Sequence, residues 1–352
     1  MSGLLTSALI LPLALALDAW LGEPRRFHPL IGFGRLALAL ETRLHGDARW
    51  RGALALTLLV LPPVLITALA AGQPWSPLLD LLVLYLAIGW RSLGEHAGRV
   101  EEALCTGDLA GARGGVGMIV SRDTATLDEV GIAKATVESV LENGNDAIFG
   151  ALFWCLIAGA PGAVLYRLTN TLDAMWGYRN ERYRRFGWAA ARLDDLLNWA
   201  PARLTALSYA LAGGYALARG DALAGGNARA GGDVLAEGQS RAGGDVLAGG
   251  HARAGGYRAA LACWRAQGPG WKSPNAGPVM AAGAGSLGIQ LGGPAIYHGA
   301  TQVRPPLGMG RPARAEDIGR ALRLIRQALA IWVGGALSLA LALTIIASAM
   351  HS

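Results

Sequence analysis

Carboxylates, amides and guanidinium groups are concentrated in residues 121–203, where two strongly polar blocks flank an apolar run. In the first block Lys134, Glu138 and Glu142 are spaced four residues apart, so a helix would place them along one face. In the second block Asn170 and Asp173 are three residues apart and would also share a face. Carboxylate and amide oxygens are the ligands that magnesium and its bound nucleotide prefer. The pattern predicts a polar, phosphate-handling site at a membrane surface.

The helix of the first block has its own start signal. Thr126 is followed three residues later by Glu129, which matches a capping box and predicts a helix from about Leu127. Apolar residues then recur at helical spacing along one stripe, namely Val130, Ala133, Val137, Val140 and Leu141. The alternative interpretation of the charged residues is a solvated face on which lysine and glutamate pair.

The second block is rich in arginine, whose guanidinium group binds phosphate or carboxylate through two parallel hydrogen bonds. A basic cluster beside a membrane segment also sets topology or binds anionic lipid. Structural ion pairing is a further alternative. Acids and amides are interspersed among these arginines at almost every turn, which lipid binding does not require. The block therefore favours a phosphate-handling site.

The composition indicates a polytopic membrane protein. Of the 352 residues 53% are hydrophobic and only 16% are charged, and the mean hydropathy is +0.34. Arginine-rich loops between apolar runs explain the net charge of +6 through the positive-inside bias, so nucleic-acid binding is not predicted. Cys105, Cys155 and Cys263 are far apart, which predicts neither a zinc site nor a disulfide.

Apolar runs predict the membrane spans. They lie at 4–17, 54–71, 78–88 and 325–348, with a further membrane-associated helix at 204–218. A full span at 148–168 would place the two polar blocks on opposite sides of the membrane. Gly159, Pro161 and Gly162 interrupt this run, so we expect a broken or re-entrant hairpin that returns the chain to the same side. Residues 294–315 are expected to form a loop.

The predicted architecture is one all-α, membrane-embedded domain over residues 1–352, with polar helices that face the cytosol. It carries a low-complexity insertion at 220–255, where a twelve-residue unit is repeated three times. The repeat keeps Asp221, Asp233 and Asp245 in register. It contains little that could be buried and is expected to be a passive loop.

Several long strings resemble the adenosylcobinamide-phosphate synthase family of cobalamin biosynthesis, called CobD or CbiB. They are SRDTATLDEVGIAKATVESVLEN (121–143), NTLDAMWGYRNERYRRFGWAAARLDDLLNWAPARLTAL (170–207), SPNAG (273–277) and LGGPAIYHG (291–299). LDAWLGEPRRFHPLIGFGR (17–35) is similar to the opening of that family. The chain departs from the family after Gly277, where Pro278-Val279-Met280 stands in place of Trp-Pro-Glu. The role of that glutamate is therefore not carried over.

The resemblance implies an ATP-dependent ligase in the cell membrane, with its active site toward the cytoplasm. Its substrates would be adenosylcobyric acid and (R)-1-amino-2-propanol O-phosphate, and ATP and Mg²⁺ would be required. A membrane transporter for a corrinoid or another anionic small molecule is the alternative, because broken helices and polar residues also mark transport paths. Oligomeric state is not predicted.

Candidate site residues follow from the polar blocks and this implied chemistry. The catalytic candidates are Asp123, Glu138, Asp173 and Asp195, and the metal-binding candidates are Glu142 and Asp146. The candidates for binding substrate or phosphate are Arg122, Asn143, Asn170, Arg179, Asn180, Arg182, Tyr183, Arg192, Arg203 and Asn275.

Overall fold

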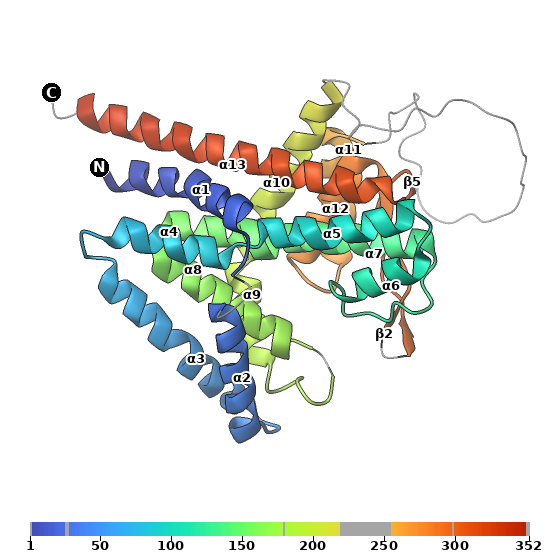
Figure 1. Ribbon diagram of the computed structural model, residues 1–352, viewed down its shortest axis with the longest axis horizontal. Helices are drawn as coiled ribbons and strands as arrows, with labels where there is room; N and C mark the ends of the chain where they lie inside the picture. The colour runs from blue at the N-terminus through green and yellow to red at the C-terminus, as the bar shows by residue number, and fades with distance from the viewer. Residues whose placement is uncertain (1, 25–27, 179, 219–254, 298, 350–352) are drawn as a thin grey trace, which may run out of the picture.

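The computed structural model describes residues 2–24, 28–178, 180–218, 255–297 and 299–349. Within them the protein is predominantly helical (Figure 1). The first half contains α1 (Ser2–Leu21), α2 (Pro29–Leu44), α3 (Arg49–Ala70), α4 (Ser76–Ala87), α5 (Trp90–Cys105), α6 (Leu109–Gly117) and α7 (Glu129–Gly144). The second half contains a π-helix, η1 (Asn145–Phe149), α8 (Gly150–Trp176), α9 (Trp188–Leu197), α10 (Trp199–Ala218), α11 (Tyr257–Gln267), the short η3 (Gly268–Gly270), α12 (Ala276–Leu287) and α13 (Glu316–Ala349). The predicted repeat insertion and Arg179 lie outside the described residues, apart from Gly255 at the end of the repeat.

Four helical stretches of the described chain are long and apolar enough to cross a membrane: Arg49–Ala70, Ser76–Cys105, Glu129–Trp176 and Glu316–Ala349. A shorter apolar helix covers Leu5–Leu21. These stretches confirm the prediction of a polytopic helical membrane protein. The apolar ends of α1, α4 and α13 extend toward one end of the molecule, while α5, α6, α7, α12 and the strands gather at the other (Figure 1).

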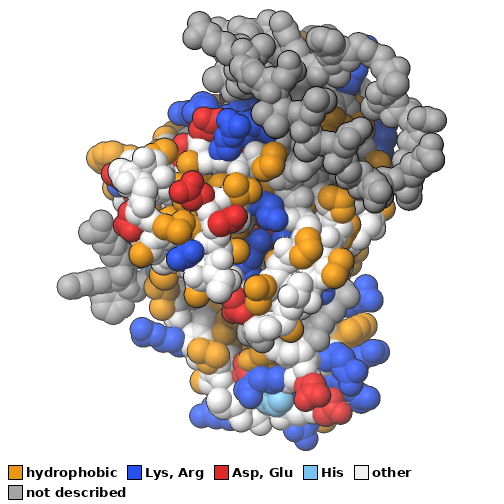
Figure 2. Space-filling view, turned by 90° about the vertical axis from the view of Figure 1, so that its right-hand side faces the viewer, with side chains coloured by type: hydrophobic (Ala, Val, Ile, Leu, Met, Phe, Trp, Pro, Cys, Tyr) orange, Lys and Arg blue, Asp and Glu red, His pale blue; other side chains and the backbone are white. Residues whose placement is uncertain are grey.

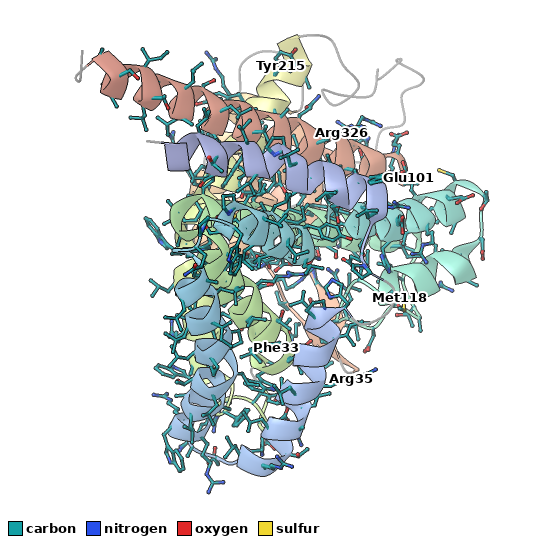
Figure 3. The ribbon with its side chains drawn as sticks, turned by 60° about the vertical axis from the view of Figure 1, so that its left-hand side comes forward. Phe33, Arg35, Glu101, Met118, Tyr215 and Arg326 are labelled. Atoms are coloured by element: carbon teal, nitrogen blue, oxygen red, sulfur yellow. The ribbon has the colours of Figure 1, made fainter. Side chains whose placement is uncertain are left out.

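Helices α2 and α3 form an arm that diverges from the rest of the bundle (Figure 3). Phe33 on α2 points toward α3 and packs against a small core that includes Leu59, Leu172 and Trp176. The other face of α3 exposes leucines such as Leu58, Leu65 and Leu69, which is the face that lipid would cover. The arm contacts the rest of the bundle mainly through α8 and α9.

The apolar run at 148–168 is a helical hairpin. Ala158 and Gly159 leave helical geometry, and Gly159 adopts φ 60° and ψ −149°, a conformation that is nearly restricted to glycine. The chain reverses direction at this break. The evidence is that the Tyr166 hydroxyl donates a hydrogen bond to the carbonyl oxygen of Asp146 at 3.1 Å. In a straight helix these residues would be about 30 Å apart. The predicted hairpin is confirmed, and it returns residues 166–176 to the end of α7.

A carboxylate from a neighbouring helix stabilises the break in this hairpin. The backbone N–H of Ala160 donates to Asp80 Oδ1 on α4 at 2.6 Å, as at a helix N-cap. An acidic residue in an apolar helix is costly unless it has a partner. Asp80 has one because the broken backbone supplies an N–H group that helix geometry has left free.

The core of the polar end is built on α7 and α12. Every residue of α12 is buried, and its sequence consists mostly of alanine and glycine. A methyl group on Gly283 would lie 2.7 Å from the Leu141 side chain of α7, so the small residues allow the two helices to approach closely. The start of α7 differs from the prediction, since Asp128 caps it by accepting from the Gly131 N–H at 2.7 Å.

Residues 294–315 are not simply a loop, so that prediction was wrong. Strand β1 (Ile289–Gly292) pairs antiparallel with β4 (Pro306–Gly308) and parallel with β5 (Arg311–Pro312). Strands β2 (Ala295–Tyr297) and β3 (Ala300–Gln302) form a separate antiparallel pair. Each strand is only two to four residues long, so the segment carries no period-2 pattern that sequence reasoning could detect.

Candidate functional site

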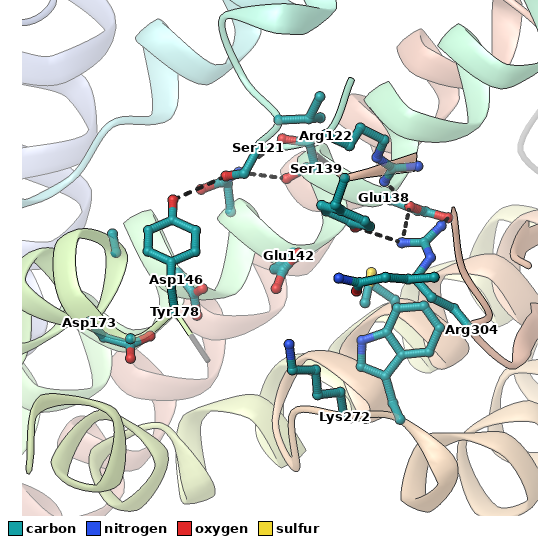
Figure 4. Close-up of a pocket in the computed structure, with 18 of the residues that line it drawn as sticks. Ser121, Arg122, Glu138, Ser139, Glu142, Asp146, Asp173, Tyr178, Lys272 and Arg304 are labelled. Atoms are coloured by element: carbon teal, nitrogen blue, oxygen red, sulfur yellow. Dashed lines mark hydrogen bonds and ion pairs between the residues drawn. The ribbon is translucent and has the colours of Figure 1, made fainter. Parts of the chain in front are cut away.

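A cavity of about 800 Å³ lies where α7, η1 and the returning limb of α8 meet the segments around residues 120, 271 and 304. Its volume falls in the range typical of small-molecule sites. Figure 2 shows this side of the molecule hollowed near its centre, with acidic and basic side chains at the margin. Figure 4 shows the lining residues, which come from both predicted polar blocks and from the C-terminal third of the chain.

One wall of the cavity carries three carboxylates. Glu142 and Asp146 lie one helical turn apart, and Asp173 approaches from the returning limb of the hairpin (Figure 4). Among the described residues, the carboxylates of Glu142 and Asp173 have no hydrogen-bond or ion-pair partner, and the carboxylate of Asp146 accepts a hydrogen bond only from Asn145, at 2.9 Å. Carboxylates held together without cations form a site that attracts positive charge.

The π-helix η1 supports this wall. The extra residue in its turn shifts the register between α7 and α8, and such π-bulges are frequent at functional sites. Behind the wall lies a buried polar network. Asn145 donates to Asn198 Oδ1 at 2.8 Å, and its own Oδ1 accepts from Thr205 at 3.0 Å. A satisfied network of this kind fixes the orientation of its members, which include the neighbours of Asp146.

Asn170, which lines the cavity, belongs to the same network. Its Nδ2 donates to Asp194 Oδ1 at 3.1 Å, and Asp194 also accepts from Asn198 at 3.2 and 3.3 Å. Burial raises the pKa of Asp194 to about 6, although the two amide hydrogen bonds act in the opposite direction. The sequence predicted Asp195 as a site acid. In the structure its neighbour Asp194 is the acid that holds Asn170 in the cavity lining.

The opposite wall is basic and is organised by Glu138. Its carboxylate pairs with Arg122, accepts from Arg304 at 3.1 and 3.2 Å, and accepts from the Gly292 N–H at 2.7 Å. With both oxygens engaged, Glu138 holds two guanidinium groups beside the cavity (Figure 4). The structure thus places this predicted catalytic acid in an ion-pair cluster, where it positions cations.

Further groups complete the basic side. Lys272 points into the cavity and has no ion-pair partner among the described residues (Figure 4). Arg304 lies over the ring of Trp271, 5.2 Å from its centroid. Asn143, also in the lining, donates to the carbonyl oxygen and the hydroxyl of Ser139 at 2.9 and 3.0 Å. The cavity therefore presents free acids on one side and a row of cations on the other.

Eight of the predicted residues line this cavity, namely Arg122, Glu138, Glu142, Asn143, Asp146, Asn170, Asp173 and Asn180. Asn180 lies at the rim, where its Oδ1 accepts from the Tyr183 N–H at 2.9 Å. Asp195 does not line the cavity.

Arg182 and Tyr183 lie away from the cavity, on Glu41 of α2. Arg182 donates to Glu41 Oε1 at 2.8 Å, the Tyr183 hydroxyl donates to the same oxygen at 3.0 Å, and Trp176 donates to Oε2 at 2.9 Å. This cluster joins the arm to the end of α8. The predicted substrate-binding role of Arg182 and Tyr183 is not supported by their position.

Four more predicted residues also lie outside the cavity lining. Arg203 donates to Asn275 Oδ1 at 2.7 Å, which ties α10 to the start of α12. Asp123 accepts from the Gly299 N–H at 2.7 Å and so anchors the β2–β3 pair. Arg192 is exposed on α9.

Sequence reasoning missed Lys272 and Arg304 as site residues. Lys272 directly precedes the family-like string SPNAG, and this position could have identified it as a candidate site residue. Arg304 lies 166 residues beyond Glu138 in the sequence, in a segment interpreted as a loop. No local pattern links the two, because their contact depends on how β1 packs against α7 and how β4 pairs with β1.

The donor set fits magnesium. No group of three or more His, Cys, Asp or Glu side chains in the described chain is arranged to hold a metal ion by itself. Magnesium, however, is usually bound through one or two carboxylates together with substrate phosphates and water. Glu142, Asp146 and Asp173 supply hard oxygen donors of that kind on one wall, and the cations opposite them suit phosphate.

Fold and site together define a polytopic helical membrane protein with a charged, ligand-sized cavity. The family model described as CobD/Cbib protein matches residues 11–325. The cobalamin biosynthesis protein CobD of Chromobacterium violaceum is 52% identical and covers 99% of this chain and 100% of its own length. Its namesake in Stutzerimonas stutzeri is 51% identical over 91% of this chain and 93% of that protein.

The cobalamin biosynthesis protein CobD of Mycobacterium tuberculosis is 36% identical over 88% of each chain. No solved structure matches. The chain therefore belongs to the CobD/CbiB family of cobalamin biosynthesis, as its sequence resemblance predicted.

Proposed function

We propose that the protein is an ATP-dependent ligase that joins adenosylcobyric acid to (R)-1-amino-2-propanol O-phosphate and yields adenosylcobinamide phosphate. Family membership supports the pathway, and the cavity supports the chemistry. The observation that carries the proposal is that carboxylates without a cationic partner in the described chain share a single cavity with Arg122, Lys272 and Arg304. This is the charge pattern that a metal-bound polyphosphate would complement.

Amide formation needs the carboxylate of the acid substrate to be activated, because an unactivated carboxylate has no good leaving group. In the proposed reaction the carboxylate oxygen attacks the γ-phosphorus of ATP, which gives an acyl phosphate and ADP. The amino group then attacks the acyl carbon and releases phosphate. Arg122, Arg304 and Lys272 would bind the phosphoryl oxygens, and Glu138 would keep the two arginines in place.

Carboxylates of the wall formed by Glu142, Asp146 and Asp173 would hold Mg²⁺ together with ATP phosphates and water, and the bound ion would neutralise charge on the transferring phosphoryl group. Asn143 and Asn170 would orient polar groups of the substrates, because both side chains are fixed by hydrogen bonds within the chain. Proton removal from the attacking amine would use a carboxylate on the same wall. Adenosylcobyric acid is larger than ATP and would extend out of the cavity through its opening.

We further propose that the protein lies in the cell membrane with this cavity toward the cytoplasm, where ATP is available. The helical hairpin supports a single site on one side of the membrane, because it returns Asn170 and Asp173 to the side on which α7 presents Glu142. A cysteine introduced at Arg184 should then react with an impermeant thiol reagent only from the cytoplasmic face. Labelling from outside intact cells would contradict the orientation.

Turnover by the purified protein in lipid provides the direct test. ADP and adenosylcobinamide phosphate should form together only when ATP, Mg²⁺, adenosylcobyric acid and the aminopropanol phosphate are all present. Mass spectrometry of the corrinoid identifies the product. The transporter alternative predicts instead that sealed vesicles accumulate a corrinoid that remains chemically unchanged, and that result would replace the ligase assignment.

A further inference from the structure

A second cavity, of about 410 Å³, lies beside the first and shares a wall with it. The segment Ile119–Ser121 and the side chain of Asn143 line both cavities. Its remaining lining comes from the α4–α5 junction, α5 and the returning limb of α8, and includes Ser92, His96 and Arg167. With about half the volume of the main cavity, it suits a ligand smaller than a nucleotide.

Arg167 is the cation of this second cavity. Its Nε is buried and has no hydrogen-bond partner among the described residues. Its Nη1 makes only two long contacts, to the carbonyl oxygen of Asp146 at 3.5 Å and to Asn170 Oδ1 at 3.3 Å. No carboxylate of the described chain lies within ion-pair distance of it. A buried guanidinium with a free N–H group is costly unless an anion completes it.

The lining of the second cavity also has acceptors. His96 Nδ1 lies 2.8 Å from the carbonyl oxygen of Ser92, which can only accept, so Nδ1 carries the proton and Nε2 keeps its lone pair in the neutral ring. Glu23, which is exposed, adds a carboxylate to the lining. The cavity thus combines one guanidinium with a carboxylate and an imidazole acceptor, which complements a small molecule with an anion and an ammonium group.

We propose that this second cavity binds the phosphorylated amino alcohol, with its phosphate on Arg167 and its amino group toward Glu23 and His96. Arg167 also contacts Asn170 and the backbone of Asp146, so the phosphate lies directly behind the carboxylate wall. Because Ile119–Ser121 line both cavities, the amino group would pass along this segment to reach the site of acyl activation. This assignment of the amine subsite rests on the proposed ligase function.

Binding of each probe alone tests the subsite without turnover. In calorimetric titration of the full-length protein in lipid nanodiscs, we expect aminopropanol phosphate to bind at least about tenfold more tightly than 1-amino-2-propanol or inorganic phosphate. Arg167→Gln should weaken its binding by about 30-fold or more. Glu23→Gln should weaken binding of aminopropanol phosphate and leave inorganic phosphate unaffected. Equal affinity of wild type and Arg167→Gln for aminopropanol phosphate would overturn the proposal.

Turnover separates a binding role of Arg167 from a structural one. Arg167→Gln should lower kcat/KM for the phosphorylated amine by about 30-fold or more and change kcat/KM for unphosphorylated 1-amino-2-propanol by less than about threefold. Arg167→Lys, which keeps the charge and loses the planar fork, should fall between wild type and Arg167→Gln and covers the case in which the glutamine variant does not fold. Arg99→Gln is the matched control, because Arg99 is exposed on α5 and lines neither cavity.

A variant that folds and keeps the wild-type preference for the phosphorylated amine would show that Arg167 is structural, and the subsite would be withdrawn while the ligase function stood. Conversely, wild-type protein that binds aminopropanol phosphate through Arg167 yet forms no amide would refute the ligase and retain the subsite.

Discussion

Two buried glutamates, Glu138 and Glu41, have the same chemistry and different functions. Each side chain is 3% exposed and pairs with arginine. Glu138 lies on the cavity wall and gathers Arg122 and Arg304 there. Glu41 gathers Arg182, Tyr183 and Trp176 at a junction between helices, away from the cavity lining. An ion pair of arginine and glutamate therefore indicates a site only when it faces a space that a ligand can occupy.

The comparison extends to the carboxylates that have no cation. A buried charge is normally paired, so unpaired carboxylates in a cavity mark groups that are kept for a ligand. Glu142 and Asp173 have no hydrogen-bond or ion-pair partner among the described residues, while Asp80 and Asp317 have backbone or arginine partners that account for them structurally. The predictions below test this distinction between free and engaged acids.

The largest effect is expected at Asp173, whose carboxylate has no hydrogen-bond or ion-pair partner among the described residues. Asp173→Asn keeps the size and removes the charge, so turnover should fall by about 100-fold or more, on the order of 3 kcal/mol in the barrier. Its melting temperature should be unchanged, because no described partner is lost. Asp108→Asn is the control, since Asp108 caps α6 and asparagine caps a helix equally well. Near-normal turnover of folded Asp173→Asn would contradict the role in holding Mg²⁺.

Glu138→Gln should have the next largest effect on turnover. Without the second anionic oxygen, Arg122 and Arg304 repel each other and shift, and we expect a loss of roughly 30-fold in kcat/KM for ATP. The melting temperature should also fall, because two guanidinium groups lose their counter-charge. Steady-state kinetics with varied ATP measures the first effect and a thermal melt in detergent the second. Retention of full kcat/KM would mean that the arginines do not bind phosphate.

Asp194 predicts how stability depends on pH. Burial raises the pKa of Asp194 to about 6, so its contribution to stability is complete below its ordinary pKa near 4 and is lost as the pH rises through 6. Between pH 5 and pH 8 the wild type should lose about 1.4 kcal/mol more stability than Asp194→Asn does, which corresponds to one pH unit below the folded pKa. Thermal melts of both proteins across this range give the difference. Parallel profiles would show that Asp194 does not titrate there.

Glu41→Gln should have the smallest effect on turnover. The junction it forms is outside the cavity lining, so kcat and KM of the folded protein should stay within about twofold of wild type. The melting temperature should fall by a few degrees, because Arg182 and Tyr183 lose a charged acceptor while Trp176 keeps a carbonyl oxygen. A loss of turnover as large as that of Glu138→Gln would show that the arm takes part in substrate binding.

Local sequence patterns determined much of this protein. The apolar runs set the membrane helices, and Gly159 with its neighbours set the hairpin, because helix formation and helix breaking depend on adjacent residues. The four-residue spacing of Glu138, Glu142 and Asp146 put all three on the cavity side of α7 and η1. The long strings of the polar blocks identified the family.

Tertiary structure alone decided which charges meet. Arg304 pairs with Glu138 because the short strands after α12 return to α7, and Arg182 binds Glu41 although 141 residues separate them in the sequence. Charged side chains of one type are interchangeable in a sequence pattern, since the pattern specifies charge and helical face and does not specify the partner. Packing of α7 against α12 and the reversal at Gly159 fix the distances, and those distances separate the acids that are free for a ligand from the acids that hold the fold together.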